Sequence, residues 1–146
     1  MRVAVVSDTH DRLPEHVCTA IAHADEIWHL GDVCTPLLLD ALTNLGTPVR
    51  IVRGNCDDDS HGWPLTRDFE IEGHRIHLIH IPPRLALAHC DLLLHGHTHV
   101  PRDERLGGVR FLNPGSIGRG KDGHPKSYAW LTLERDRSPE WSIVHV

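Results

Sequence analysis

Residues 3–10 read VAVVSDTH, and this stretch decides the fold class. Four apolar residues in succession are typical of a strand that is buried on both faces. The apolar run ends at Ser7 and Asp8, where such a strand would give way to an exposed loop. The sequence therefore predicts an α/β protein whose first strand is followed by a loop carrying Asp8 and His10.

The same pattern of a short apolar strand followed by a polar loop recurs twice in the first third of the chain. Gly31-Asp32 follows the second predicted strand, and Arg53-Gly54-Asn55 follows the third. Apolar residues at helical spacing lie between the strands, with Pro14 near the start of one predicted helix and Gly46 at the end of the other. We expect strands at residues 26–30 and 49–52 and helices at residues 14–24 and 36–45. The order β-α-β-α-β implies a parallel sheet with helical crossovers.

The remainder of the chain is richer in predicted strands. Gly73-His74 lies between two segments that look like the strands of a hairpin. We expect this hairpin at residues 68–72 and 75–80, a short helix at 83–89, and strands at 92–94, 109–112, 127–133 and 141–146. The sequence shows no internal repeat, low-complexity tract or linker, so we expect a single domain over residues 1–146.

Composition excludes several classes of protein. Fifteen Lys and Arg against twenty Asp and Glu give a net charge of −5, which is unsuited to gripping the backbone of a long nucleic acid. The four cysteines show no CxxC spacing, so neither a zinc knuckle nor a redox motif is indicated. No apolar run approaches the length of a membrane span, and the apolar start is too short for a signal peptide. These features predict a cytoplasmic protein that does not bind membranes.

Polar residues with metal-binding side chains directly follow the predicted strands. Loops at the carboxyl ends of parallel strands converge on one edge of a sheet, so these side chains could share one cavity. The set comprises Asp8, His10, Asp32, Asn55, His97 and His99. Carboxylate, imidazole and amide ligands suit Mn, Fe, Zn or Co. Each motif alone has a plain structural alternative, a helix cap for residues 8–10 and a turn for Gly31-Asp32 or Gly54-Asn55, but their shared position after strands favours a metal site.

The motifs together resemble those of the calcineurin-like metallophosphoesterase superfamily. The matching residues, in order, are Asp8-x-His10, Gly31-Asp32, Gly54-Asn55, His80 and Gly96-His97-Thr98-His99. The segment Asn113-Pro114-Gly115-Ser116 is similar to that of the small YfcE-like phosphodiesterases of bacteria and archaea, a branch that also includes the retromer subunit Vps29. The resemblance implies a four-layer α-β-β-α sandwich of two mixed sheets with a dinuclear metal site at one edge.

The resemblance also implies a ligand set and a reaction. One metal would be held by Asp8, His10, Asp32 and His99, and the second by Asp32, Asn55, His80 and His97. Mn is the expected metal, with Ni, Co, Fe, Zn and Mg as alternatives. The expected reaction is hydrolysis of a small phosphate ester, foremost a diester, by a hydroxide that bridges the two metals. Asn55, Cys56 and Asp57 would be the catalytic residues.

Two departures from the family pattern affect the predicted roles. Cys56, followed by Asp57, occupies the position where the wider superfamily has a histidine proposed to protonate the leaving group. Cys56 is therefore either a poor general acid or a packing residue, and good leaving groups should be favoured. His80 is followed by Ile81-Pro82-Pro83 instead of Gly-His, which leaves His77 as a competing metal ligand. Arg119, with Lys121, is either a phosphate contact or part of a solvated loop.

Two other functions compete with the enzyme. A scaffold of the Vps29 type would use the same fold to bind proteins, and a histidine-rich metal buffer would use the fourteen histidines. The complete set of expected ligand types favours the enzyme over the scaffold, and the dispersed histidines argue against the buffer. We expect a small phosphate ester or nucleotide as substrate, with homo-oligomerisation left open.

Overall fold

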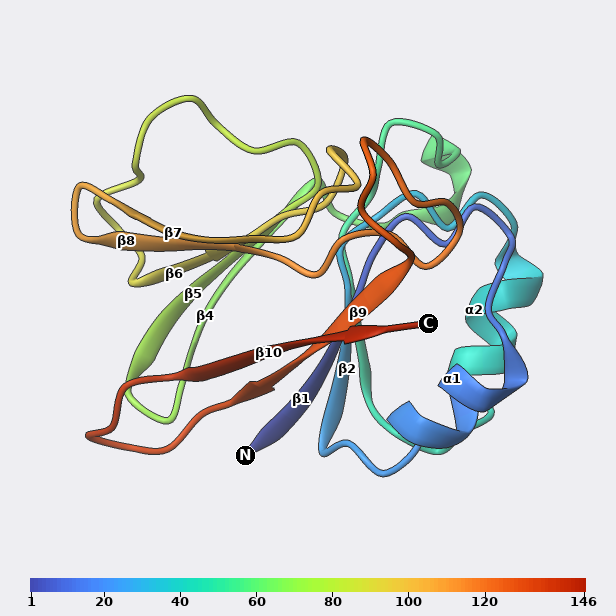
Figure 1. The fold of residues 1–146 in the computed structure, drawn as a ribbon, viewed down its shortest axis with the longest axis horizontal. Helices are drawn as coiled ribbons and strands as arrows, with labels where there is room; N and C mark the ends of the chain where they lie inside the picture. Colours follow the sequence, from blue (N-terminus) through green and yellow to red (C-terminus); the bar gives the residue numbers. More distant parts are fainter.

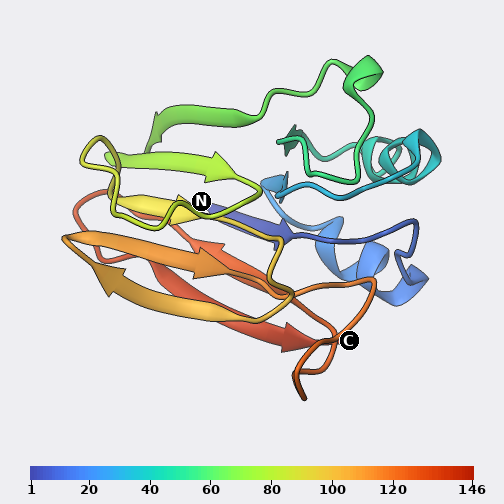
Figure 2. The same ribbon diagram turned by 90° about the horizontal axis from the view of Figure 1, so that it is seen from above.

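Two mixed five-stranded sheets lie face to face in the computed structural model (Figures 1 and 2), which describes residues 1–146 and every side chain except that of Pro36. The strand order is β10-β9-β1-β2-β3 in the first sheet and β4-β5-β6-β8-β7 in the second. The fold class predicted from the sequence, α/β with two mixed sheets, is confirmed. None of the described helices is long and apolar enough to cross a membrane.

The first sheet contains the predicted β-α-β-α-β unit. Strands β1 (Arg2–Val6), β2 (Glu26–His29) and β3 (Val49–Ile51) pair in parallel, joined by helices α1 (Glu15–Ile21) and α2 (Pro36–Thr43). Strand β9 (Ser127–Thr132) pairs antiparallel with β1, and β10 (Glu140–His145) extends the sheet beside β9. Both helices cover the outer face of this sheet (Figure 1).

The second sheet begins with the predicted hairpin. Strands β4 (Thr66–Ile71) and β5 (His74–Ile79) pair antiparallel, and β5, β6 (Leu92–Leu94) and β8 (Val109–Asn113) are parallel. Strand β7 (Arg102–Leu106) forms the antiparallel edge beside β8. The sequence analysis missed β7, because its RDERL sequence has mostly exposed polar residues and no alternation of apolar ones. A short 3-10 helix, Asp59–His61, precedes β4.

Alternating side chains of each sheet build the core. Val3 and Val5 of β1 point between the sheets and pack with Ile76 and Leu78 of β5. Ala4 and Val6 point the other way, beneath the helices. This two-residue period follows from strand geometry, in which successive side chains lie on opposite faces. Burial of one such Val or Ile side chain contributes about 1.5–3 kcal/mol to folding.

The outer face of the second sheet is covered by an irregular segment, residues 81–91. The prediction of a short helix at residues 83–89 is therefore wrong. The segment forms turns and bends and crosses the sheet as a broad arch, yellow-green in Figure 1. Ala86 and Leu87 pack on a small cluster with Phe111, whereas Leu85 is 79% exposed. A seven-residue helix is marginal in water unless an apolar face is buried, and two anchoring residues do not supply such a face.

Candidate metal centre

The loops that follow the strands meet at one end of the two sheets and are joined by backbone hydrogen bonds. The amide of Asp8 donates to the carbonyl of Gly31, and the amide of His10 donates to the carbonyl of Asp32, both at 3.0 Å. In the second sheet the amide of Gly96 donates to the carbonyl of His80, also at 3.0 Å. Residues far apart in the sequence are thereby held at a common edge, as the pattern of strands followed by polar loops predicts.

The candidate ligands have strained backbone conformations. Asp8, His10, Asp32, His97 and His99 have φ angles of 51°, 44°, 57°, 67° and 61°, in the left-handed region that residues other than glycine rarely adopt. Each such residue costs of order 1–3 kcal/mol, and this cost is tolerated chiefly at functional sites. The concentration of strain in these loops points to function at this edge.

Two glycines allow the loops to approach this closely. A Cβ atom at Gly96 would overlap Oγ of Ser7 and lie 2.7 Å from Oδ2 of Asp8. A Cβ atom at Gly54 would overlap the Oδ1 and amide nitrogen of Asp32. Both glycines therefore belong to their motifs for a steric reason, since any side chain would displace a carboxylate of the site.

One cluster of donor atoms is formed by Asp8, His10 and His99. Nε2 of His99 lies 3.1 Å from Oδ1 of Asp8 and 3.4 Å from Nε2 of His10. Nε2 of His10 is 3.9 Å from the same Asp8 oxygen and 3.8 Å from Oδ2 of Asp32. Asp8 and His99 are buried and His10 is partly exposed, so the cluster lies at the base of an open site.

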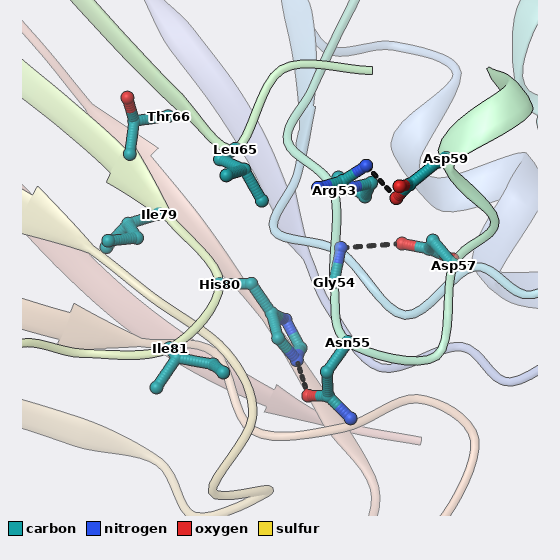
Figure 3. Close-up of a pocket in the computed structure, with 10 residues that line it drawn as sticks. All are labelled: Arg53, Gly54, Asn55, Asp57, Asp59, Leu65, Thr66, Ile79, His80 and Ile81. Atoms are coloured by element: carbon teal, nitrogen blue, oxygen red, sulfur yellow. Dashed lines mark hydrogen bonds and ion pairs between the residues drawn. The ribbon is translucent and has the colours of Figure 1, made fainter. Parts of the chain in front are cut away.

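A second cluster is formed by His80, Asn55 and His97. The Asn55 amide oxygen lies 3.0 Å from Nε2 of His80 and 2.9 Å from Nδ1 of His97. Figure 3 shows the His80 ring pointing toward Asn55 from the end of β5. His77, the competing candidate, lies on β5 in contact with Asp68 and takes no part in this cluster.

Asp32 lies between the two clusters and presents one carboxylate oxygen to each. Oδ1 lies 3.4 Å from Nε2 of His80, and Oδ2 lies 3.8 Å from Nε2 of His10. Oδ1 also accepts a 2.8 Å hydrogen bond from the amide of Cys56. A carboxylate in this position is suited to bridge two ions.

The hydrogen bonds around the histidines fit a cation. Nδ1 of His99 lies 3.2 Å from the carbonyl of Arg119, and Nδ1 of His80 lies 2.7 Å from the carbonyl of Leu30. A carbonyl only accepts, so both Nδ1 atoms donate and each neutral ring has its Nε2 lone pair directed into the site. Oδ1 of Asp8 is buried and accepts no hydrogen bond from the described side chains. Acceptors that face one another in this way require positive charge between them.

The pKa shifts show the same demand for positive charge. Burial opposes the charged form of Asp32, but hydrogen bonds from His80 and the Cys56 amide outweigh it and hold the pKa of Asp32 below its usual range. Contact with the Asp8 carboxylate raises the pKa of His99. Burial alone would lower the pKa of His80, yet Asp32 and Asp8 raise it. A metal ion bound by these rings would have to displace their protons, so metal affinity should fall as the pH falls through the raised pKa values.

An open cavity of about 450 Å³ lies over both clusters. Its lining includes His10, Asp32, Asn55, Cys56, His97, His99, Arg119 and Lys121. Cys56 and Arg119 are exposed at its rim. Burial and the neighbouring Asp32 raise the pKa of the Cys56 thiol, which therefore stays protonated at neutral pH. The cavity thus brings together five of the predicted ligands (His10, Asp32, Asn55, His97 and His99), the predicted acid and two cationic side chains.

The chain matches a known protein family. A model of the calcineurin-like phosphoesterase superfamily domain matches residues 1–136. The chain belongs to this superfamily. Metallophosphoesterases bind divalent metal ions. The candidate ligand groups at this edge of the chain include Asp8 with His10 and His99, and Asp8 with Asp32 and His80.

Three relatives illustrate the range of functions in the superfamily. A probable metallophosphoesterase of Methanothermobacter thermautotrophicus is 40% identical over 135 residues, which cover 80% of this chain and 77% of the relative. Phosphodiesterase YfcE of Escherichia coli K12 is 32% identical over 160 aligned positions, covering 90% and 87%. The solved structure of YfcE matches the full length of both chains with a TM-score of 0.80 at 27% identity. Vps29 of Entamoeba histolytica, solved in complex with zinc, matches with a TM-score of 0.80 at 26% identity, covering 99% and 98%.

The Asp57 carboxylate is directed at backbone amides and away from the cavity. Its Oδ2 accepts from the amides of Asp32 and Gly54 at 2.9 and 2.7 Å, the latter drawn in Figure 3. Its Oδ1 accepts from the amides of Val33 and Cys34 at 2.8 and 2.9 Å. Asp57 thus clamps the Asp32 loop to the Asn55 loop. This geometry supports a positioning role instead of the catalytic role expected from the sequence.

We expect Asp57→Asn to destabilise the fold by about 2–4 kcal/mol, because an amide NH₂ would face backbone amides that now share a buried carboxylate. Misplacing both loops should weaken manganese binding about 10–100-fold. Chemical denaturation and manganese titration measure the two effects, with the exposed neighbour Asp58→Asn as the matched control that should change neither. Wild-type stability and metal binding, together with an altered dependence on the leaving group, would assign Asp57 to proton transfer.

Several residues that hold the ligands were missed by the sequence analysis. Ser7 donates to Oδ2 of Asp8, and Sγ of Cys34 lies 3.5 Å from Nδ1 of His10. The position of Ser7 beside Asp8 was the available signal, whereas no spacing rule connects Cys34 with His10. Nε2 of His29 lies 3.0 Å from Oγ1 of Thr9, and its Nδ1 accepts a hydrogen bond from the amide of Gly31. Burial lowers the pKa of His29 to about 4, so this ring is neutral at physiological pH.

Proposed function

We propose that this member of the superfamily hydrolyses a small phosphate ester, foremost a diester, at a dinuclear metal centre. The proposed ligands are Asp8, His10, Asp32 and His99 for one ion and Asp32, Asn55, His80 and His97 for the other. The observation that carries the proposal is the position of Asp32, whose two oxygens face separate clusters of donors. The activity is proposed to be cytoplasmic, as the sequence predicts.

The side chains of this centre would bind the metal ions and orient the substrate. Carbonyl groups of Leu30 and Arg119 fix the rings of His80 and His99 with Nε2 directed inward. Arg119 and Lys121, on the cavity wall, are placed to attract an anionic phosphoryl group. When bound, two divalent ions supply activation of the attacking water and neutralisation of phosphoryl charge. The protein residues then have the task of positioning, with no protein nucleophile required.

The organic group of the ester has an adjoining hollow to occupy. A cavity of about 400 Å³ borders Asn55 and His80, and Figure 3 shows Leu65, Ile79 and Ile81 on one side of it. Arg53 lines the same cavity and is paired with Asp59. An apolar wall beside a cationic side chain suits an aryl or nucleoside group better than a highly charged one.

A metal-reconstituted assay tests the proposal. The chain should hydrolyse phosphodiesters when loaded with Mn, Ni, Co, Zn or Mg, and a chelator should abolish the activity. A panel of phosphomonoesters, phosphodiesters and nucleotides identifies the preferred class. Preference for monoesters would retain the metallophosphoesterase and reject the diesterase assignment.

Cys56 should make the reaction strongly dependent on the leaving group. Its thiol is a poor acid with a raised pKa, so aryl esters should react much faster than alkyl esters. Cys56→His supplies an acid with a pKa near neutrality and should narrow the ratio of aryl to alkyl rates by about tenfold or more.

Cys56→Ser serves as the control for the size of the side chain, since it keeps a small hydroxyl without a usable acid. The ratio of aryl to alkyl kcat/KM values measures the effect for each variant. If neither substitution changes the ratio, Cys56 is a packing residue and water or substrate protonates the departing oxygen.

A protein-binding scaffold is the second candidate function, favoured by the similarity to Vps29. Because that Vps29 structure contains zinc, metal binding alone does not separate the scaffold from the enzyme. Turnover does separate them. Absence of hydrolysis with all five metals, in a protein that binds them, would favour the scaffold.

A further inference from the structure

A separate group of metal-binding side chains lies on the outer face of the second sheet. Asp68 of β4 and His77 of β5 are directly opposed in the antiparallel ladder. His77 is on the face opposite to Ile76 and Leu78, which point into the core between the sheets. His89 reaches the same place from the 81–91 segment. The group shares no residue with the proposed dinuclear centre.

Three donor atoms of this group converge on one point. Oδ1 of Asp68 lies 2.7 Å from Nδ1 of His77 and 2.9 Å from Nε2 of His89, and the two nitrogens are 3.3 Å apart. Zinc binds imidazole nitrogen and carboxylate oxygen at about 2.0–2.2 Å, so neighbouring donors of a tetrahedral shell are about 3.3 Å apart. The triangle needs to open by only about half an ångström at its shortest side to hold an ion.

One of the three side chains is buried and held in place, and the other two are open to solvent. The His77 side chain is 6% exposed, whereas those of Asp68 and His89 are 56% and 55% exposed. The buried ring fixes the position of one ligand, and the exposed pair leaves room for solvent to complete the coordination. Two imidazoles and one carboxylate suit zinc, cobalt, nickel or copper better than magnesium or calcium.

The His77 ring makes all its polar contacts at one nitrogen, the one that faces Asp68 and His89. Its Nε2 is buried and has no partner among the described side chains and backbone, so every polar contact of this ring is at Nδ1. An imidazole buried in this way is costly unless the interaction at Nδ1 is a strong one. Ligation through Nδ1 leaves the ring proton on Nε2, and the metal bond then holds the ring in place.

We propose that Asp68, His77 and His89 form a mononuclear zinc site that fastens the 81–91 segment to the outer face of the second sheet. The segment occupies the place where a helix was expected. Ala86, Leu87 and Cys90 pack it on the sheet, and its last residue, Asp91, pairs with Arg75. An ion at His89 would fix its end just before β6. The site would therefore act as a clasp for an irregular layer that lacks a continuous apolar face.

Zinc stoichiometry tests the proposal on the full chain. After equilibrium dialysis against zinc, His89→Ala should bind one zinc ion fewer per chain than the wild type. His16→Ala, which removes an exposed histidine of α1, is the matched control and should bind as many as the wild type. Because the test is a difference of one ion, its outcome is independent of how many ions the proposed dinuclear centre binds.

Two further measurements locate the ion. Cobalt-substituted wild type should show visible d–d absorption that is reduced in His89→Ala and in Asp68→Asn, without a thiolate band from Cys90, whose Sγ bonds to the carbonyl of Leu87. Zinc should slow amide exchange within residues 84–90 of the wild type at least tenfold and leave His89→Ala unchanged. Equal zinc stoichiometry in wild type, His89→Ala and Asp68→Asn would overturn the proposal.

Discussion

Asp32→Asn should reduce phosphoesterase activity by about a thousandfold or more and weaken the binding of both metal ions. Asp32 presents one oxygen to each cluster, Oδ1 toward His80 and Oδ2 toward His10. Asparagine keeps one oxygen but replaces the second by an NH₂ group, which cannot bind a cation. Loss of charge neutralisation at the reacting phosphoryl group typically removes a factor of about 10²–10³ for each such interaction.

The fold should survive this substitution. The retained oxygen can still accept the hydrogen bond from the Cys56 amide, and the Asp32 amide remains bound to Asp57. Manganese titration of Asp32→Asn, with circular dichroism to verify folding, measures the effect. Loss of one ion with undiminished binding of the other would contradict the bridging role of Asp32.

His80→Ala should lower manganese-dependent activity by about a hundredfold or more and remove one of the two ions, whereas His77→Ala should leave the reaction intact. Nε2 of His80 faces Asn55 and Asp32 within 3.4 Å, while His77 contacts Asp68 and His89 on the outer face of the sheet. His77→Ala should instead cost about 1–3 kcal/mol of stability through the loss of a buried side chain.

Steady-state kinetics and thermal unfolding of the two variants in manganese provide the comparison. His77 and His80 lie on or directly after the same strand, so each variant controls for general damage by the other. The reverse pattern, with activity lost in His77→Ala and retained in His80→Ala, would mean that the ligand of the second ion had been assigned to the wrong histidine.

Strand and helix order in the first sheet was predictable because burial on both faces leaves continuous apolar runs. Residues 3–6 have this character and form β1 at nearly the expected bounds. Residues 26–30 include Glu26 and His29, but they are buried from Ile27 onward and form β2. The helix expected at residues 14–24 is shorter, Glu15–Ile21, since Ala22 to Ala24 turn into the next strand instead of continuing the apolar face. Residues 83–89 contain Leu and Ala, which favour a helix by propensity, but only Ala86 and Leu87 pack against the sheet and no continuous apolar face is formed.

The predicted ligands come together because loops at the ends of parallel strands must converge. Asp8, Asp32 and His99 lie side by side for this reason, although long stretches of sequence separate them. The clamp role of Asp57 could not be predicted from the sequence, since its partners are backbone amides that no sequence pattern reveals. The opposition of Asp68 and His77 likewise depends on the register of the hairpin, which a sequence fixes only to within a residue or two.

Hydrolysis of an aryl phosphodiester, followed while manganese is titrated into metal-free protein, tests the central claim most directly. Two ions joined by Asp32 should make the activity absent in the metal-free chain and maximal when both ions are bound. Asp32→Asn should be at least about a thousandfold less active at the same concentration of added manganese. Using His89→Ala as the parent protein removes the proposed zinc site of Asp68, His77 and His89 from the number of bound ions. Full activity with a single ion bound would contradict the dinuclear centre, and no turnover at any manganese concentration would contradict the enzyme itself.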